Sequence, residues 1–217
     1  MCRFFLWGDL VSETYKTVHQ NAVAEFTEKR SRFIGAVAPV RDESQAQAFI
    51  AEIRRQHRDA RHNVFAYRLR AGGVKRYSDD GEPQGTAGVP VLDVLEKANV
   101  QDIVIVVTRY FGGVLLGGGG LVRAYSHTAH LALEAGKIVL MERQTLFRAH
   151  VDYAFHGKLL KLLESFDAKV TNTEFAEDVT LEIVLPGEKA ALLYDKVFDL
   201  SAGKVKLEKF GEKFAEK

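Results

Sequence analysis

Two periodicities alternate along the first part of the chain and predict its strands and helices. Residues 103–107 are an unbroken run of Ile and Val, too short and too β-branched for a buried helix, which predicts a central strand covered on both faces. Residues 42–57 instead place apolar side chains such as Ile50 and Ile53 at helical spacing, with Asp42 or Ser44 placed to cap the helix. The same reasoning predicts a hairpin of strands 18–26 and 32–40 around the turn 27–31, a strand at 62–69, and helices at 86–98 and 121–135.

After Gly136 the order of elements changes. The pattern predicts a strand at 146–153, a helix at 158–166, strands at 169–175 and 179–185, a helix at 189–200 and a strand at 204–210. This βαββαβ order is typical of a ferredoxin-like domain, in which two helices cover one face of a sheet. We therefore predict an α+β protein of two domains, residues 14–138 and 139–217, preceded by an N-terminal extension of residues 1–13.

Composition limits the classes of protein that fit this pattern. Hydrophobic residues make up 47% of the chain, with only four prolines, which argues against disorder. No apolar run approaches the roughly 20 residues of a membrane span, and the lone cysteine, Cys2, excludes a disulfide framework, so we expect a cytoplasmic protein. The net charge is only +1, yet a cluster of arginines suggests an anionic partner, the alternative being a merely solvated face. These arginines are Arg54, Arg55, Arg58, Arg61, Arg68, Arg70 and Arg76.

The predicted central strand runs into Arg109, two aromatics and two glycine clusters before the next helix. A strand, a glycine-rich turn and a helix N-terminus together can bind anions, because N–H groups and the helix dipole point at the ligand, and Arg123 adds positive charge. Strand alternation places Arg109 and Phe111 on one face and Tyr110 on the other. Nucleotide motifs are absent, since Gly118 stands where a P-loop needs lysine. The alternative is that the glycines only permit tight helix-to-sheet packing.

Few residues of the first domain are placed for catalysis or metal binding. The neighbouring carboxylates Asp79, Asp80 and Glu82 are of the type that binds magnesium, but their spacing is not that of an EF-hand. The alternative is turn chemistry, with Thr86 capping the next helix. His62 is either a base or the donor of one buried hydrogen bond, and we favour the hydrogen bond. No serine or cysteine is placed for covalent catalysis.

Four blocks of sequence together resemble the IMPACT family. They are Asp59-Ala-Arg-His62, Tyr77-Ser-Asp-Asp-Gly-Glu-Pro83, Gly85-Thr-Ala-Gly88, and Arg109-Tyr-Phe-Gly-Gly113 followed by Leu116-Gly117. The blocks occur in the family's order, the resemblance covers residues 18–135, and residues 146–210 resemble the C-terminal domain of bacterial members. The resemblance implies an N-terminal α/β sandwich like the fourth domain of elongation factor G, followed by a domain like that factor's ferredoxin-like fifth domain.

The resemblance also implies a function linked to translation. Eukaryotic members of the family restrain the amino-acid-starvation kinase, part of a stress response, by competing for its ribosome-associated activator protein, whereas bacteria lack that kinase. We therefore expect a non-catalytic regulator that binds RNA or a ribosome-associated protein, with no cofactor, no bound metal and no membrane partner. Arginines and glycine-loop amides would hold phosphates, and exposed aromatics among Tyr77, Tyr110, Phe111 and Tyr125 would stack bases. The candidate binding residues are Arg61, His62, Tyr77, Asp79, Asp80, Glu82, Arg109, Tyr110, Phe111, Gly112, Gly113, Gly117, Gly118, Gly119, Arg123 and Tyr125.

Two other functions remain open from the sequence. One is a magnesium-dependent enzyme of phosphoryl or phosphate-ester chemistry, in which Asp79, Asp80 and Glu82 hold the ion beside the glycine-rich loop. The other is binding of protein alone, in which the same blocks form an apolar and arginine-rich patch.

Overall fold

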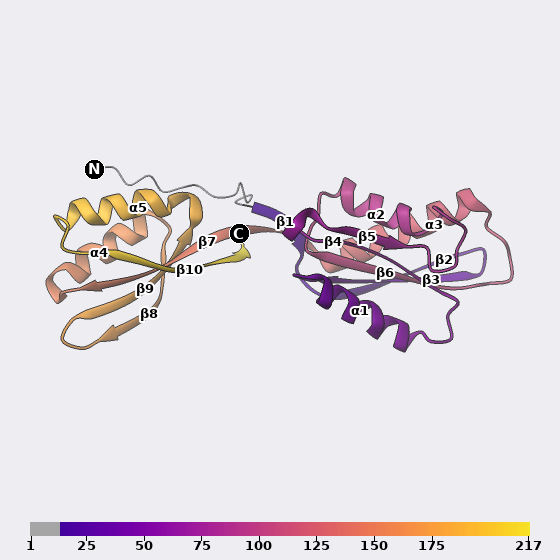
Figure 1. The fold of residues 1–217 in the computed structure, drawn as a ribbon, viewed down its shortest axis with the longest axis horizontal. Helices are drawn as coiled ribbons and strands as arrows, with labels where there is room; N and C mark the ends of the chain where they lie inside the picture. The colour runs from indigo at the N-terminus through magenta and orange to yellow at the C-terminus, as the bar shows by residue number, and fades with distance from the viewer. Residues whose placement is uncertain (1–13) are drawn as a thin grey trace. The chain divides into compact units, whose positions relative to one another are not determined.

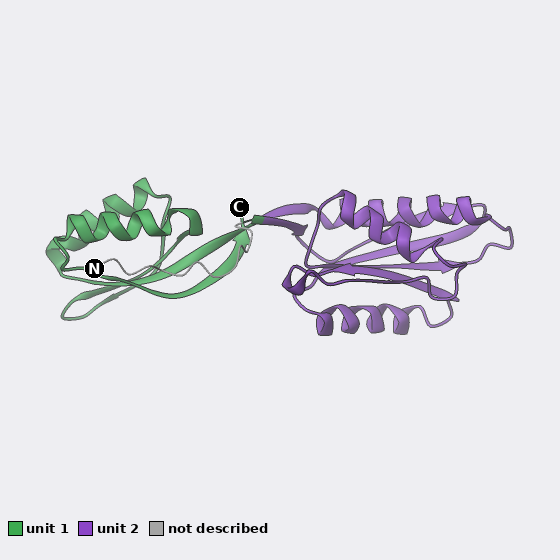
Figure 2. Cartoon of the chain, turned by 45° about the horizontal axis from the view of Figure 1, so that its top comes forward, with its two compact units in different colours: residues 1–14, 141–217 green, residues 15–140 purple. Residues whose placement is uncertain are grey.

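The computed structural model describes residues 14–217, which divide into two compact units (Figure 2). One unit is residues 15–140, and the other contains residues 141–217 together with Thr14. The predicted N-terminal extension, with Cys2, lies outside the described residues. Within residues 14–217, no helix is both long enough and apolar enough to cross a membrane.

The first unit is an antiparallel sheet between helices (Figure 1). Its strand order is β2 (Ala22–Glu28), β3 (Ser31–Pro39), β6 (Ile103–Tyr110), β4 (His62–Arg68) and β5 (Lys75–Ser78). One face is covered by α1 (Glu43–Gln56), and the other by α2 (Gly88–Lys97) and α3 (Gly118–Gly136). A short 3-10 turn, Ala71–Gly73, joins β4 to β5.

β6 lies in the middle of this sheet because its side chains are apolar on both faces. Val104 and Val106 pack in the cluster beneath α1, whereas Ile103 and Ile105 pack in the cluster beneath α2 and α3. Each is fully buried, and burying such a side chain contributes about 1.5–3 kcal/mol. The prediction of a central strand covered on both faces is confirmed. Of the two residues predicted to cap α1, the cap is Asp42, since its Oδ1 accepts the Gln45 N–H at 2.8 Å.

Three features of the first unit differ from the sequence prediction. The strand predicted at 18–26 begins only at Ala22, as β2, and β1 (Thr14–Val18) was not predicted; the chain turns between them at His19. The His19 N–H donates to the Gly136 and Lys137 carbonyls at 3.0 and 2.8 Å, which holds the turn. The short edge strand β5 was absent from the prediction, and α3 begins at Gly118 rather than at residue 121.

Antiparallel pairing brings the ends of several elements together. Arg109, near the end of β6, lies opposite Phe33 near the start of β3 and opposite His62 at the start of β4. The β2–β3 turn, the segment after α1, the loop before α2 and the glycine segment after β6 therefore lie at one end of the sheet. We call these segments the loop end: residues 29–30, 57–61, 79–87 and 111–117.

The second unit has the ferredoxin-like topology. Its elements are β7 (Ile138–Val151), α4 (Tyr153–Ser165), β8 (Lys169–Phe175), β9 (Val179–Pro186), α5 (Gly187–Leu200) and β10 (Leu207–Glu216). The strands are antiparallel in the order β10-β7-β9-β8, and both helices cover one face (Figure 1). β1 also pairs with β7, whose residues 138–140 belong to the first unit. The predicted βαββαβ order and the α+β class are confirmed.

Several boundaries in the second unit lie elsewhere than predicted. β7 begins at Ile138, eight residues before the predicted start at 146. Tyr153 begins α4 instead of ending a strand, because Asp152 caps the helix by accepting the Phe155 N–H at 2.7 Å. β10 begins at Leu207 and continues to Glu216, beyond the predicted strand at 204–210.

Candidate functional site

Asp79 holds the loop that leads into α2. Its Oδ1 accepts the N–H groups of Ala87 and Gly88 at 3.1 and 2.7 Å, and its Oδ2 accepts the Gly85 N–H at 2.8 Å. A carboxylate at a helix N-terminus is favoured by the helix dipole. The prediction that Thr86 caps α2 is wrong. The Thr86 hydroxyl donates to the Pro83 carbonyl, and Asp79 accepts the N–H groups at the start of the helix instead.

Asp80 fastens the same loop to the sheet and to α1. Its carboxylate accepts the Asn63 N–H at 2.6 Å and pairs with Arg54 Nη2 at 2.8 Å. Its carbonyl lies 2.9 Å from His62 Nδ1, and because a carbonyl can only accept, Nδ1 carries the proton. This half-buried hydrogen bond is the one that the sequence favoured for His62. Asp80 adopts a φ of 45°, a left-handed conformation that these three contacts stabilise.

Glu82 is the centre of a buried group with Arg109 and Tyr125. Its Oε1 accepts from Arg109 Nη1 at 2.7 Å and from the Tyr125 hydroxyl at 2.8 Å. The Glu82 and Arg109 side chains are 3% and 7% exposed, and Tyr125 is fully buried. Burial, and then the Glu82 charge, raise the pKa of the Tyr125 hydroxyl far above its ordinary value, so it remains a donor. Three elements are thus joined by one ion pair and one hydrogen bond.

Two phenylalanines flank the Arg109 guanidinium. Its Cζ lies 5.6 Å from the Phe33 ring centroid and 5.5 Å from that of Phe111, and Phe33 meets Tyr125 edge to face. Arg109 Nε is buried and has no hydrogen-bond partner within residues 14–217. Arg109 is therefore part of the interior and is not available to grip a phosphate at the surface. For the same reason Tyr125 cannot stack a base, and that part of the prediction is wrong.

The carboxylates proposed as a magnesium site do not converge. Asp79 faces loop amides, Asp80 faces Arg54 and Glu82 faces Arg109. In the part of the chain that the structure describes, no three His, Cys, Asp or Glu side chains are grouped to hold a metal ion.

Tyr110 lies on the other face of β6 from Arg109. Its hydroxyl donates to Asp59 Oδ1 at 3.1 Å and lies 2.9 Å from His57 Nδ1, at the end of α1. Burial, and then the hydrogen bond to Asp59, raise the pKa of Tyr110. The alternation predicted for residues 109–111 is confirmed, and the Tyr110 hydroxyl ties the segment after α1 to the sheet.

The glycines after β6 have three different structural roles. At Gly112, a Cβ would lie 2.0 Å from the Arg30 carbonyl carbon, so the backbone of the β2–β3 turn occupies the space of a side chain. Gly113 and Gly117 have φ values of 84° and 72°, which favour glycine. Gly118 and Gly119 are the first turn of α3, whose cap residue has no side chain to satisfy the helix N–H groups. Tight packing thus explains Gly112, and the free helix start keeps the predicted anion site possible.

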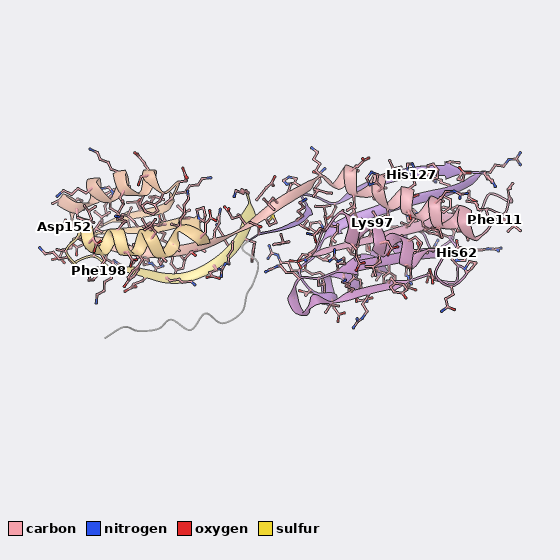
Figure 3. The ribbon with its side chains drawn as sticks, turned by 90° about the horizontal axis from the view of Figure 1, so that it is seen from above. His62, Lys97, Phe111, His127, Asp152 and Phe198 are labelled. Carbon is pink, nitrogen blue, oxygen red and sulfur yellow. The ribbon has the colours of Figure 1, made fainter. Side chains whose placement is uncertain are left out.

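The surface of the loop end carries exposed cations and exposed apolar side chains. Phe111 is 48% exposed and Leu115 is 83% exposed. Tyr77, which is 49% exposed, lies outside the loop end, in β5 opposite Ala66. Figure 3 shows His62 and Phe111 at the same end of the first unit. Five exposed cations at or beside this end form no ion pair within residues 14–217: Lys29, Arg30, Arg58, Arg61 and Arg123. The sequence analysis missed Lys29, Arg30 and Arg58, although the charged turn 27–31 and the arginine cluster contained the signal.

Comparison with known proteins places the chain among relatives along most of its length. Residues 29–133 match the family model described as the Impact N-terminal domain, and residues 150–204 match a domain of unknown function, DUF1949. The IMPACT family member YvyE of Bacillus subtilis is 35% identical over 192 residues, covering 88% of each chain. The IMPACT family member YigZ of Escherichia coli is 37% identical over 182 residues, covering 82% of this chain and 89% of its own.

Two further matches differ in extent. Protein IMPACT of Bos taurus is 36% identical over 95 residues, which is 42% of this chain and 30% of the bovine one. A crystal structure described as that of an hypothetical protein has a TM-score of 0.61 and 33% identity, and covers 92% of this chain and 98% of its own.

Proposed function

We propose that this chain, which belongs to the IMPACT family, is a cytoplasmic, translation-linked regulatory protein that binds single-stranded RNA through the loop end, without catalysis. The observation that carries the proposal is a separation of charge. The carboxylates of the loop before α2 are bonded to other groups of the first unit: Asp79 to amides, Asp80 to Arg54, and the buried Glu82 to Arg109. The nearby cations, Lys29, Arg30, Arg58, Arg61 and Arg123, remain exposed.

This arrangement suits a phosphate backbone. Arginine binds phosphate through paired hydrogen bonds and dominates where such groups are gripped. Within the loop end, Lys29, Arg30, Arg58 and Arg61 are matched in number by four carboxylates, Asp59, Asp79, Asp80 and Glu82, so the charge that a ligand meets there depends on which of these groups are already bonded within the protein. Of these, Asp59 accepts the Tyr110 hydroxyl.

An exposed ring favours single strands over duplexes. Phe111, within the loop end, is half exposed, and an unpaired base can stack on such a ring, with each stacked base contributing about 1–3 kcal/mol. Bases within a duplex are already stacked on one another and cannot do so. The magnesium enzyme is a weaker candidate because Asp79, Asp80 and Glu82 bind other parts of the protein.

The link to translation rests on family membership, and a ribosome-associated protein is the second candidate partner. The exposed apolar side chains of Phe111 and Leu115 favour it, because a protein partner needs an apolar contact as well as charge. An RNA partner and a protein partner are distinguished by how binding depends on salt and on nuclease treatment.

Binding of fluorescent single-stranded RNA across a salt series tests the proposal. We expect the slope of log K against log salt to fall by roughly 1.4 in the double variant Arg61→Gln, Arg123→Gln, at about 0.7 for each phosphate that the protein no longer neutralises. The matched control is Arg76→Gln with Lys97→Gln, which removes the same charge from β5 and from the last turn of α2, outside the loop end. A slope that is the same for both double variants would refute the proposal. A partner captured from nuclease-treated lysate through Leu115, with no RNA binding, would favour the second candidate.

A further inference from the structure

A hollow beside the loop end lies mostly outside the residues that the family blocks contain. It has a volume of about 630 Å³ and lies between the end of β2 and the first half of α3. Its principal side chains are Phe26, Lys29, Leu116, Val122, Arg123 and His127.

The hollow has an apolar floor with a ring at its side. Phe26 and Leu116 are half buried against the core of the first unit, and Val122 is partly exposed. The His127 ring meets Phe26 at a steep angle, with centroids 4.6 Å apart and an interplanar angle of 76°. Phe26 therefore packs against the His127 ring, whose exposed part is open to other contacts.

Leu116 depends on a neighbouring glycine for its place in the hollow. A Cβ on Gly120 would lie 2.9 Å from Leu116 Cβ, closer than side chains approach, so the absence of a side chain at Gly120 lets Leu116 lie against α3. The apolar floor is thus fixed by the local backbone and not only by a flexible side chain.

Charge lines the rim of the hollow. Lys29 and Arg123 are exposed and form no ion pair within the described residues, and Glu28 is the one carboxylate among the lining residues. The Arg123 guanidinium lies over the first turn of α3, with Nη1 3.7 Å from where a Cβ on Gly119 would be. An occupant therefore meets an apolar floor, a ring and two cations.

We propose that this hollow holds one nucleotide of a single-stranded RNA, with its base against His127 and the apolar floor and its phosphates on Lys29 and Arg123. The inference rests on the proposed function and names where one base of that RNA is bound. A flat, apolar group with an attached anion matches the side chains present, and the volume is within the range of small-molecule sites. An acidic peptide would satisfy the cations but would leave the ring and the apolar floor without a flat partner.

The test compares an oligouridine with an abasic ribose-phosphate strand of equal length, using fluorescence anisotropy. His127→Ala should weaken oligouridine binding about tenfold, leave the abasic strand unchanged, and leave the salt slope unchanged, because stacking is not electrostatic. His127→Phe should retain the affinity. His130→Ala is the matched control, because His130 lies exposed three residues on in α3 and pairs with Glu134.

Lys29→Gln should change the binding data in a different way from His127→Ala, because Lys29 would contact a phosphate and not a base. It should weaken both strands and lower the salt slope by about 0.7. An equal loss on both strands in His127→Ala would mean that His127 meets only the backbone, and no loss would mean that the base lies elsewhere; either result overturns the inference. The proposed function fails separately, when the unaltered protein shows no salt-dependent RNA binding that Arg61 and Arg123 control.

Discussion

Removing the Glu82 carboxylate should strongly destabilise the first unit. Within residues 14–217, Arg109 Nη1 and the Tyr125 hydroxyl each donate only to Glu82. Both donors are buried, so neither can turn to water when the carboxylate is lost. In Glu82→Ala the interior therefore contains an uncompensated charge and an unsatisfied hydroxyl.

The magnitude follows from burial. An exposed ion pair would contribute less than about 1 kcal/mol, but breaking a buried one costs about 3–5 kcal/mol. With side chains 3% and 7% exposed, Glu82 and Arg109 belong to the buried class. We expect Glu82→Ala to lower the free energy of unfolding of the first unit by about 4 kcal/mol. Glu82→Gln keeps an acceptor oxygen but leaves the Arg109 charge uncompensated, so it should cost less than Glu82→Ala but more than the roughly 1 kcal/mol of a neutral hydrogen bond.

Hydrogen–deuterium exchange with peptide resolution is the assay. Amides of β6 should exchange faster by roughly three decades in Glu82→Ala, since each 1.4 kcal/mol is about one decade. Amides of β9, in the second unit, serve as the internal control and should exchange at the unaltered rate.

A triple variant decides whether the cost comes from the orphaned partners. Replacing Glu82 by Leu, Arg109 by Met and Tyr125 by Phe removes every polar member together, and buried pairs replaced in this way are often neutral in stability. The triple variant should lie within roughly 2 kcal/mol of the original protein and be more stable than Glu82→Ala. If the triple variant is instead less stable than Glu82→Ala, the reasoning about uncompensated charge is refuted.

Two further predictions concern Tyr125 and the glycines. Because the folded state raises the pKa of Tyr125, its contribution to stability is complete below the unfolded value of about 10 and is lost as pH rises above it, at about 1.4 kcal/mol per pH unit. Chemical denaturation followed by circular dichroism should show a shallower loss of stability above that pH in Tyr125→Phe, and an equal slope would contradict the prediction. Gly112→Ala should destabilise by roughly 1–3 kcal/mol, since its Cβ would meet the Arg30 backbone, whereas Gly157→Ala, in α4 with open space around it, should stabilise by about 1 kcal/mol. If Gly112→Ala and Gly157→Ala move the thermal midpoint in the same direction, the clash with the Arg30 backbone does not explain the effect of Gly112→Ala.

Hydrophobic periodicity predicted the helices and strands that pack through apolar side chains at regular spacing. β6 and α1 have unambiguous patterns because they pack through side chains at regular spacing. The break between β1 and β2 could not be read in this way, because it depends on hydrogen bonds from His19 to Gly136 and Lys137, far along the chain. β5 was not predicted, because its four mostly exposed residues at a sheet edge have no periodic pattern of apolar side chains.

Single polar contacts were the least predictable part of the site. Arginine is usually a surface residue. Arg109 can be buried only because Glu82, 27 positions away in the chain, pairs with it. Asp79 caps α2 although it lies nine positions before Gly88, the first residue of the helix. Local sequence rules favoured Thr86, which is only two positions before it. The sequence located the segments that meet at the loop end, but the direction in which each side chain points depends on contacts between segments.

The structure separates the residues that shape the loop end from those that face a ligand. Within the blocks that resemble the family, Asp79, Asp80, Glu82 and Arg109 bond to other parts of the first unit and fix its loops. Four of the five exposed cations, Lys29, Arg30, Arg58 and Arg123, lie outside those blocks. A protein that shares the blocks therefore shares the frame but can present different side chains to its partner. The partner of this chain follows from its own exposed cations and rings, which is why variants at these exposed positions, and not at the carboxylates bonded to other groups of the first unit, are the ones that test binding.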